Sequence, residues 1–138
     1  MRALTIRQPW ADAIAHGTKR TENRTRKAPA KRIGTRILIH AGAAYDSMGR
    51  FIITDRNALN SWPDTRGAII AVATLTSSHF AAGCCCKGWG EPNVHHWMLT
   101  DVTALPEPVP AKGALGFWKP ADDVITAAIT QTQAARQQ

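Results

Sequence analysis

Apolar and polar residues alternate at the start of the chain and then adopt a helical spacing. In residues 3–8 (ALTIRQ), Leu4 and Ile6 would share one face, which predicts a short, half-buried strand. Pro9 suits the first turn of a helix, where its missing N–H group costs nothing. Trp10, Ala13 and Ile14 are then spaced by helical turns and form a narrow apolar stripe. The pattern therefore predicts a strand followed directly by a short helix.

The polar stretch GTKRTENR follows this helix. Gly17 fits the left-handed residue that commonly ends a helix. Residues 19–26 are polar and predict an extended segment, in which Glu22 and Arg24 share one face while Lys19 points the other way. The three charged side chains can therefore meet only if Lys19 lies in the turn or beside a bulge.

Apolar runs and turn residues predict the rest of the fold. In order, we expect a loop over 25–36, a strand over 36–42, a helix over 46–59, a central strand over 68–76, a loop over 81–93, a strand over 95–102, an extended connection through the prolines at 106, 108 and 110, a strand over 114–118 and a helix over 121–135. These elements predict an α+β fold built on a small β-barrel of five to six strands with flanking helices. The length suits a single domain over 1–138, with a C-terminal helix in 121–138 whose end frays.

Positive charge is concentrated in one part of the chain. The formal net charge is +7, and eight of the 17 Lys and Arg residues fall between positions 19 and 36: Lys19, Arg20, Arg24, Arg26, Lys27, Lys31, Arg32 and Arg36. Only Glu22 opposes them there. Such clustering favours a polyanionic partner, because each neutralised phosphate releases counterions. A merely solubilising surface, or a protein-interaction domain with incidental charge, is the alternative.

The sequence gives no sign of a membrane segment. The longest uncharged apolar run, residues 67–76, is well short of the roughly 20 residues that a membrane-spanning helix needs. The N-terminal residues lack the apolar core of a signal peptide. We therefore expect a cytoplasmic protein without a membrane partner.

The three cysteines, Cys84, Cys85 and Cys86, are consecutive. An odd, adjacent set does not form a disulfide framework. A zinc site using Cys84, Cys86, His95 and His96 is an alternative, but the spacing differs from that of zinc ribbons and fingers. The interpretation that we favour is ordinary reduced thiols in a loop, so no metal and no cofactor are predicted.

Two stretches of the chain resemble a known family. LTIRQPWADAI followed by GTKRTENR resembles the opening of ASCH domains, whose signature G-x-K-x-x-E-x-R is filled here by Gly17, Lys19, Glu22 and Arg24. HHWMLTDVTALPEPVPAKGALGFWK resembles the closing strands of the ASCH branch with an IRQPWA-type opening. The resemblance covers about residues 3–119, and two separated stretches in the right order are more specific than one motif.

The resemblance implies a β-barrel similar to the PUA domain, an RNA-binding module, with the signature residues lining a cleft. Lys19, Glu22 and Arg24 would then form the wall of the cleft and supply its chemistry. The residues expected to contact RNA or another nucleic acid or nucleotide are Arg7, Gln8, Trp10, Arg20, Arg26, Lys27, Lys31, Arg32, His40 and Trp89. Arginine and lysine would take phosphates, and a tryptophan would stack on an unpaired base. Trp89, in a Gly-rich loop, is the tryptophan expected to be most exposed.

The resemblance also implies a hydrolase as the alternative function. Small ASCH proteins are amidohydrolases of 4-acetylcytidine that use a lysine, a threonine and a glutamate. Lys19 matches their lysine, but Glu22 stands where they have threonine, and their distal glutamate has no identified counterpart. Other ASCH proteins resemble ribonucleases, for which His40, His95 or His96 could move protons.

Overall fold

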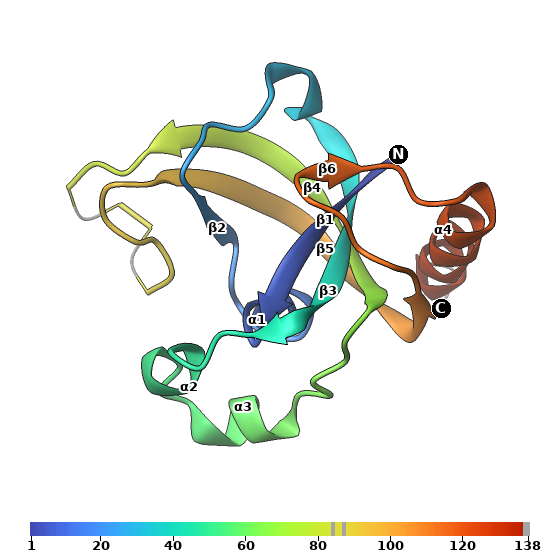
Figure 1. Ribbon diagram of the computed structural model, residues 1–138, viewed down its shortest axis with the longest axis horizontal. Coiled ribbons are helices and arrows are strands. Elements are labelled where there is room, and N and C mark those ends of the chain that lie inside the picture. The colour runs from blue at the N-terminus through green and yellow to red at the C-terminus, as the bar shows by residue number, and fades with distance from the viewer. Residues whose placement is uncertain (84, 87, 137–138) are drawn as a thin grey trace.

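A single mixed sheet forms the centre of the computed structural model, which describes residues 1–83, 85–86 and 88–136 (Figure 1). Its strands are β1 (Arg2–Gln8), β2 (Thr21–Arg24), β3 (Thr35–Tyr45), β4 (Ala68–Phe80), β5 (His95–Pro110) and β6 (Phe117–Trp118), in the order β2-β5-β4-β3-β1-β6. The helices are α1 (Trp10–Ala15), α2 (Gly49–Ile52), α3 (Arg56–Ser61) and α4 (Asp122–Arg136), with a 3-10 turn at Ala30–Arg32. Only the β1–β3 pair is parallel among the described pairs.

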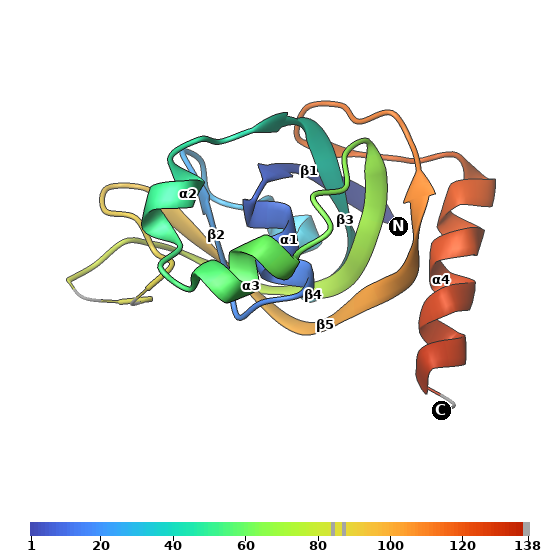
Figure 2. The same cartoon turned by 90° about the horizontal axis from the view of Figure 1, so that it is seen from below.

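Both faces of the curled sheet are covered, which explains the continuous apolar runs of β3 and β4. Helix α1 lies within the concave face, and α4 packs outside it (Figure 2). In β3, Ile37 and Ile39 belong to the core that includes Ile14 of α1, whereas Leu38 belongs to the core that includes Ala128 of α4. Successive side chains of one strand thus stabilise opposite layers.

The α+β class predicted from the sequence is confirmed, but the sheet is not closed by hydrogen bonds. Strands β2 and β6 are its two edges. Side chains bridge the opening between them: Arg24 Nη2 donates to the carbonyl oxygen of Thr5 at 3.0 Å, and the rings of Trp97 and Phe117 stack with centroids 5.6 Å apart. The result is a strongly curled, barrel-like sheet with one open seam.

Several elements differ from the sequence prediction. The expected strand over 114–118 is reduced to Phe117–Trp118, and β3 and β4 continue past the expected ends at 42 and 76 to Tyr45 and Phe80. The expected helix over 46–59 is two short helices, α2 and α3, and the Asp55 side chain caps α3 by accepting from the N–H of Ala58. Strand β5 continues through the prolines to Pro110, beyond the expected strand over 95–102. Because β2 pairs only with residues 95–98, the second half of β5 is an edge among the described strands, where proline is tolerated.

The C-terminal helix forms as predicted and ends at Arg136; the predicted fraying falls on residues 137–138, outside the described residues. None of the helices described for this chain is both long and apolar enough to cross a membrane.

Candidate functional site

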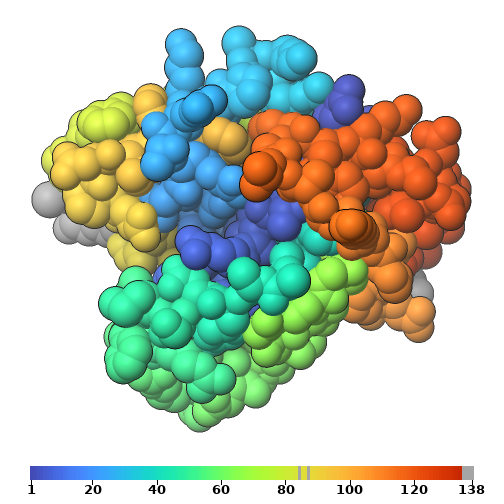
Figure 3. Space-filling model, in the orientation of Figure 1, coloured from blue at the N-terminus to red at the C-terminus, as the bar shows by residue number. Residues whose placement is uncertain are grey.

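A pocket of about 380 Å³ opens between α1, β2 and the loop before β5. In the space-filling view, the blue N-terminal segment is recessed between the sky-blue, gold and turquoise segments that surround it (Figure 3). The charged lining residues are Arg7, Lys19, Glu22, Arg24, Asp46 and Glu91, and Trp10 and Trp89 add aromatic surface. The wall therefore combines three cations, three carboxylates and two indole rings.

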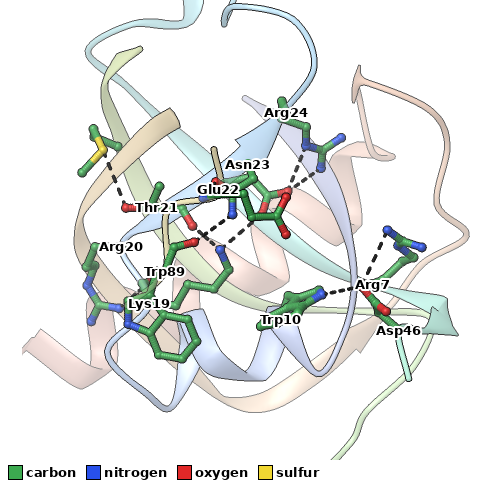
Figure 4. Close-up of polar contacts among 12 residues, drawn as sticks. Arg7, Trp10, Lys19, Arg20, Thr21, Glu22, Asn23, Arg24, Asp46 and Trp89 are labelled. Atoms are coloured by element: carbon green, nitrogen blue, oxygen red, sulfur yellow. Dashed lines mark hydrogen bonds and ion pairs between the residues drawn. The ribbon is translucent and has the colours of Figure 1, made fainter. Parts of the chain in front are cut away.

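Lys19 lies in the turn between α1 and β2, which is the placement that lets it meet Glu22. Its backbone N–H donates to the carbonyl oxygen of Ala13 at 3.1 Å, which fixes the turn against the helix. Its Nζ donates to the carbonyl oxygen of Thr21 and lies 3.9 Å from Glu22 Oε1 (Figure 4). Lys19 is only 2% exposed, so this ammonium group is almost entirely removed from solvent.

Glu22 connects the lysine to an arginine. Glu22 and Arg24 are two residues apart on β2 and share a face, as the strand pattern predicts. Both Nε and Nη2 of Arg24 lie 2.9 Å from Glu22 Oε2, which leaves Oε1 toward Lys19. The same guanidinium donates to Thr5 across the seam of the sheet. Arg24 thus orients the carboxylate and joins β2 to β1.

Two tryptophans enclose the Lys19 ammonium group. Its Nζ lies 5.7 Å from the centre of the Trp10 ring and 5.9 Å from that of Trp89, within the range of cation–π attraction. The two indoles meet edge to face at 6.5 Å, and Trp10 Nε1 donates to Asp46 Oδ2 at 3.0 Å. Trp89, the tryptophan expected to be most exposed, is partly buried where it packs into this site.

Burial lowers the pKa of Lys19 below its ordinary value, because desolvation penalises the charged amine. Glu22 and Glu91 oppose this shift by attraction, and Arg24 adds to it by repulsion. A lysine with a lowered pKa releases its proton more readily than a surface lysine, so it can act as a nucleophile or accept a proton. The same side chain, when protonated, is a hydrogen-bond donor.

Asn23 fastens the loop before β5 to the pocket. Its Nδ2 donates to the carbonyl oxygen of Trp89, and its Oδ1 accepts from the N–H of Glu91, both at 2.9 Å. Sequence reasoning missed Asn23, Asp46 and Glu91. Asn23 stands inside the signature at an unspecified position, and the other two lie in turns whose sequence carries no pattern that indicates a pocket.

Two residues expected to contact nucleic acid are buried elsewhere. Gln8 is 0% exposed; its Oε1 accepts from the N–H of Asp12 in the first turn of α1, and its Nε2 donates to the carbonyl oxygen of Thr65. His40 is 1% exposed, with its Nε2 bound to the carbonyl oxygen of Ala111. Direct contact by either residue is therefore corrected: Gln8 positions α1, and His40 packs in the interior.

The predicted basic residues divide into three groups. Arg7 and Arg24 line the pocket, and the Arg7 side chain is 64% exposed at its mouth. Arg20 is outside the pocket and donates to the carbonyl oxygens of Ile14, Gly17 and Lys19, where it stabilises the end of α1. Arg26, Lys27, Lys31 and Arg32 form what we call the basic segment, which follows Thr25 at the pocket wall and is largely exposed.

Gly17 has a different role from the one its sequence position suggests. It does not adopt the left-handed conformation. A Cβ at this position would lie 2.8 Å from the carbonyl oxygen of Ala13 and 2.9 Å from the Trp62 ring. The signature glycine is therefore required by close packing of the turn that carries Lys19.

The curled sheet, the helix inside its concave face and the charged pocket define a PUA-like α+β domain. A model of the ASCH domain matches residues 4–105, and the chain belongs to this family. The crystal structure of ASCH from Zymomonas mobilis is similar, with a TM-score of 0.57 at 14% identity, covering 94% of this chain and 93% of that chain.

Two single-substitution variants of the Zymomonas mobilis protein give TM-scores of 0.55 and 0.56, each at 14% identity and 94% coverage of this chain, with 96% and 94% of their own chains covered. At this identity the likeness concerns the fold alone. The sequence matches no curated protein.

Proposed function

We propose that this ASCH domain binds RNA or a modified nucleoside by enclosing one base in the pocket. The observation that carries the proposal is the pairing of Lys19 Nζ with Glu22 Oε1, 3.9 Å apart, beside the rings of Trp10 and Trp89. A donor next to an acceptor complements a base edge on which an acceptor neighbours an amino group, as in cytosine and adenine. A volume of about 380 Å³ is in the range of small-ligand pockets.

The distribution of charge supports binding of the base inside the pocket and of the phosphates outside it. Three cations and three carboxylates line the pocket, so its interior suits an uncharged base better than a phosphate. Phosphates would instead lie at the mouth, near the exposed guanidinium of Arg7, and along the basic segment. Stacking on an indole is worth about 1–3 kcal/mol per base. PUA-like domains are generally linked to RNA, which supports the same class of partner.

The test is equilibrium binding of short single-stranded RNA, measured by fluorescence anisotropy at low and moderate salt. We expect affinity to fall with salt, and Lys19→Ala to weaken binding about tenfold or more, because a loss of about 1.4 kcal/mol corresponds to tenfold. Lys112→Ala, which removes an exposed lysine outside the pocket, is the matched control and should change affinity less than about twofold.

Salt-independent binding, or equal losses in the two lysine variants, would contradict the proposal. Circular dichroism of each variant establishes that the fold is retained. Lys19→Met, which keeps much of the buried volume without the amine, provides a second variant if Lys19→Ala unfolds.

The lowered pKa of Lys19 favours hydrolysis as a second candidate function. An uncharged Lys19 amine close to Glu22 and Glu91 could accept a proton from water as that water attacks the acyl carbon, and then donate the same proton to the leaving amine as the C–N bond breaks. Glu22, which replaces the threonine of the family's amidohydrolases, would then hold and orient the amine.

Incubation with RNA and with acetylated cytidine, followed by mass spectrometry, tests this second function. We expect products that are absent from a Lys19→Ala control. If no product forms while binding persists, the pocket is a binding site without turnover.

A further inference from the structure

The loop between β4 and β5 extends beyond the ends of these two strands (Figure 1). A second cluster of reactive side chains lies where this loop meets the strand ends. It comprises His79 at the end of β4, Cys85 and Cys86 in the loop, and His96 at the start of β5. One ligand atom from each residue lies within 4.8 Å of the other three. None of the four lines the pocket that contains Lys19.

Three of the six distances between ligand atoms in the cluster match those around a tetrahedral zinc ion, and the other three are at most 4.8 Å. Cys85 Sγ lies 3.6 Å from His79 Nε2 and 3.5 Å from His96 Nδ1, and Cys86 Sγ lies 3.6 Å from His79 Nε2. Bond lengths of about 2.3 Å to sulfur and about 2.0–2.1 Å to nitrogen, at tetrahedral angles, place sulfur and nitrogen about 3.5–3.6 Å apart. The four atoms thus surround a position that all of them could reach.

Groups around the cluster orient two of its members. His96 is 1% exposed, and its Nε2 is 2.7 Å from the carbonyl oxygen of Glu91. If Nε2 donates to this carbonyl, the Nδ1 that faces Cys85 carries the free lone pair, which is the arrangement common at histidine-ligated metals. The backbone N–H of Ala82 donates to Cys85 Sγ at 3.4 Å.

The loop is shaped to bring Cys86 against His96. Gly90 lies between them, and a Cβ there would lie 2.7 Å from both Cys86 Cβ and His96 Cε1. Its N–H donates to the carbonyl oxygen of Cys86 at 2.7 Å. Cys86 has a positive φ of 57°, which is uncommon for a residue with a side chain. A non-glycine residue at position 90 would separate two members of the cluster.

We propose that His79, Cys85, Cys86 and His96 bind one zinc ion in a closed, structural Cys2His2 site. Two thiolates and two imidazoles form a tetrahedral donor set that suits Zn²⁺, and four protein ligands leave no open position for substrate. The proposal replaces the expectation of ordinary reduced thiols, and its ligand set differs from the one that sequence spacing suggested. His95 instead packs edge-on against Phe80, and Cys84 lies outside the described residues.

The zinc site would also support one wall of the pocket. Trp89 and Glu91 follow Cys86 along the same loop, and both line the pocket. Glu91 joins the two regions, since its carbonyl oxygen binds His96 and its N–H binds Asn23. The ion would fix one end of this loop while Asn23 fixes its middle.

Metal analysis of the purified full chain, without a histidine tag, tests the assignment. After expression with added zinc, we expect elemental mass spectrometry to find about one zinc ion per chain. Cys85→Ser, Cys86→Ser and His79→Ala should each reduce zinc to background. His95→Ala and Cys84→Ser, which alter neighbouring residues of the same chemistry, should retain it.

Replacement of zinc by Co²⁺ gives a second readout, a thiolate-to-cobalt charge-transfer band with the absorption of a tetrahedral ion. If the ligand variants unfold, the wild-type chain decides: removal of zinc by a chelator should lower Tm by several degrees, and zinc should restore it. A wild-type chain that binds neither ion would overturn the proposal. So would zinc retention in folded Cys85→Ser and Cys86→Ser, or zinc loss in His95→Ala or Cys84→Ser. None of these measurements uses RNA, so they are independent of the proposed function.

Discussion

The pocket and the basic segment are adjacent along the chain, but they differ in exposure. The charged side chains at the centre of the pocket are buried, whereas most of those in the basic segment are exposed to solvent. In the pocket, Lys19 and Glu22 are 2% and 7% exposed and have defined partners. In the basic segment, Arg26, Lys27 and Lys31 are exposed. Exposed charges attract a polyanion over a distance but discriminate little, whereas buried charges have altered chemistry and fixed geometry. A high density of charge in the sequence therefore indicates a surface that attracts polyanions. Burial of a few charged residues indicates the site where a ligand would be recognised.

The largest difference between pocket and basic-segment variants should appear in the free energy of unfolding. Arg24→Ala leaves the buried Glu22 carboxylate without its 2.9 Å partner, so we expect the free energy of unfolding to fall by about 3 kcal/mol. Lys31→Ala, in the basic segment, should change it by less than about 0.5 kcal/mol. Urea denaturation measures both values. Equal losses in the Arg24 and Lys31 variants would remove the distinction.

Neutralising the basic segment should affect binding rather than folding. We expect replacement of Arg26, Lys27, Lys31 and Arg32 by glutamine to reduce the slope of log affinity against log salt by up to about 3, at about 0.7 per single-strand phosphate contact. Anisotropy titrations with single-stranded RNA over a series of salt concentrations measure the slope. An unchanged slope would assign the segment to solubility instead.

A smaller effect is expected where the pocket wall is held by one side chain. Asn23→Ala removes two hydrogen bonds to the loop that carries Trp89 and Glu91, each worth about 1 kcal/mol. We expect RNA affinity to fall severalfold and tryptophan fluorescence to change. Asn57→Ala, an exposed amide on α3, is the control and should alter neither. Identical behaviour of the two variants would mean that the loop does not depend on Asn23.

The smallest effect is a pH dependence that distinguishes Lys19 from the exposed lysines. Below its lowered pKa, native Lys19 holds a proton that burial penalises. Between that pKa and the ordinary value of 10.5, the native state releases the proton while the unfolded chain keeps it, so stability rises with pH.

The stability advantage of Lys19→Met over wild type should therefore shrink as pH increases from neutral toward about 10. Unfolding free energies of both proteins across this range measure it. The same comparison with Lys31→Met should show no such trend, and a constant difference for Lys19→Met would contradict the burial argument.

Sequence patterns predicted most strands because burial requires apolar residues at fixed intervals. The failure over 46–59 is informative: Met48, Phe51 and Ile52 have helical spacing but are 57%, 73% and 47% exposed. A periodic apolar stripe predicts a long helix only when another element covers it. Here none of the described elements does, and the segment forms two short helices.

The signature predicted the centre of the pocket, but local pattern could not predict its other side. Glu91 lies 69 positions after Glu22, and only the curled sheet brings its loop to β2. Gln8 and His40 show the reverse error, because a polar residue in the sequence can be buried and serve internal hydrogen bonds. Which distant segments meet, and which polar residues are buried, depends on the folded chain and cannot be predicted from a local sequence pattern.

The tight packing at Gly17 limits how this domain can be re-engineered. Because the Ala13 carbonyl and the Trp62 ring leave no room for a Cβ at position 17, we expect other residues there to disrupt the turn that carries Lys19. Altered ligand preference is better sought at the pocket mouth, where Arg7 and Thr25 are exposed and substitutions leave the scaffold intact.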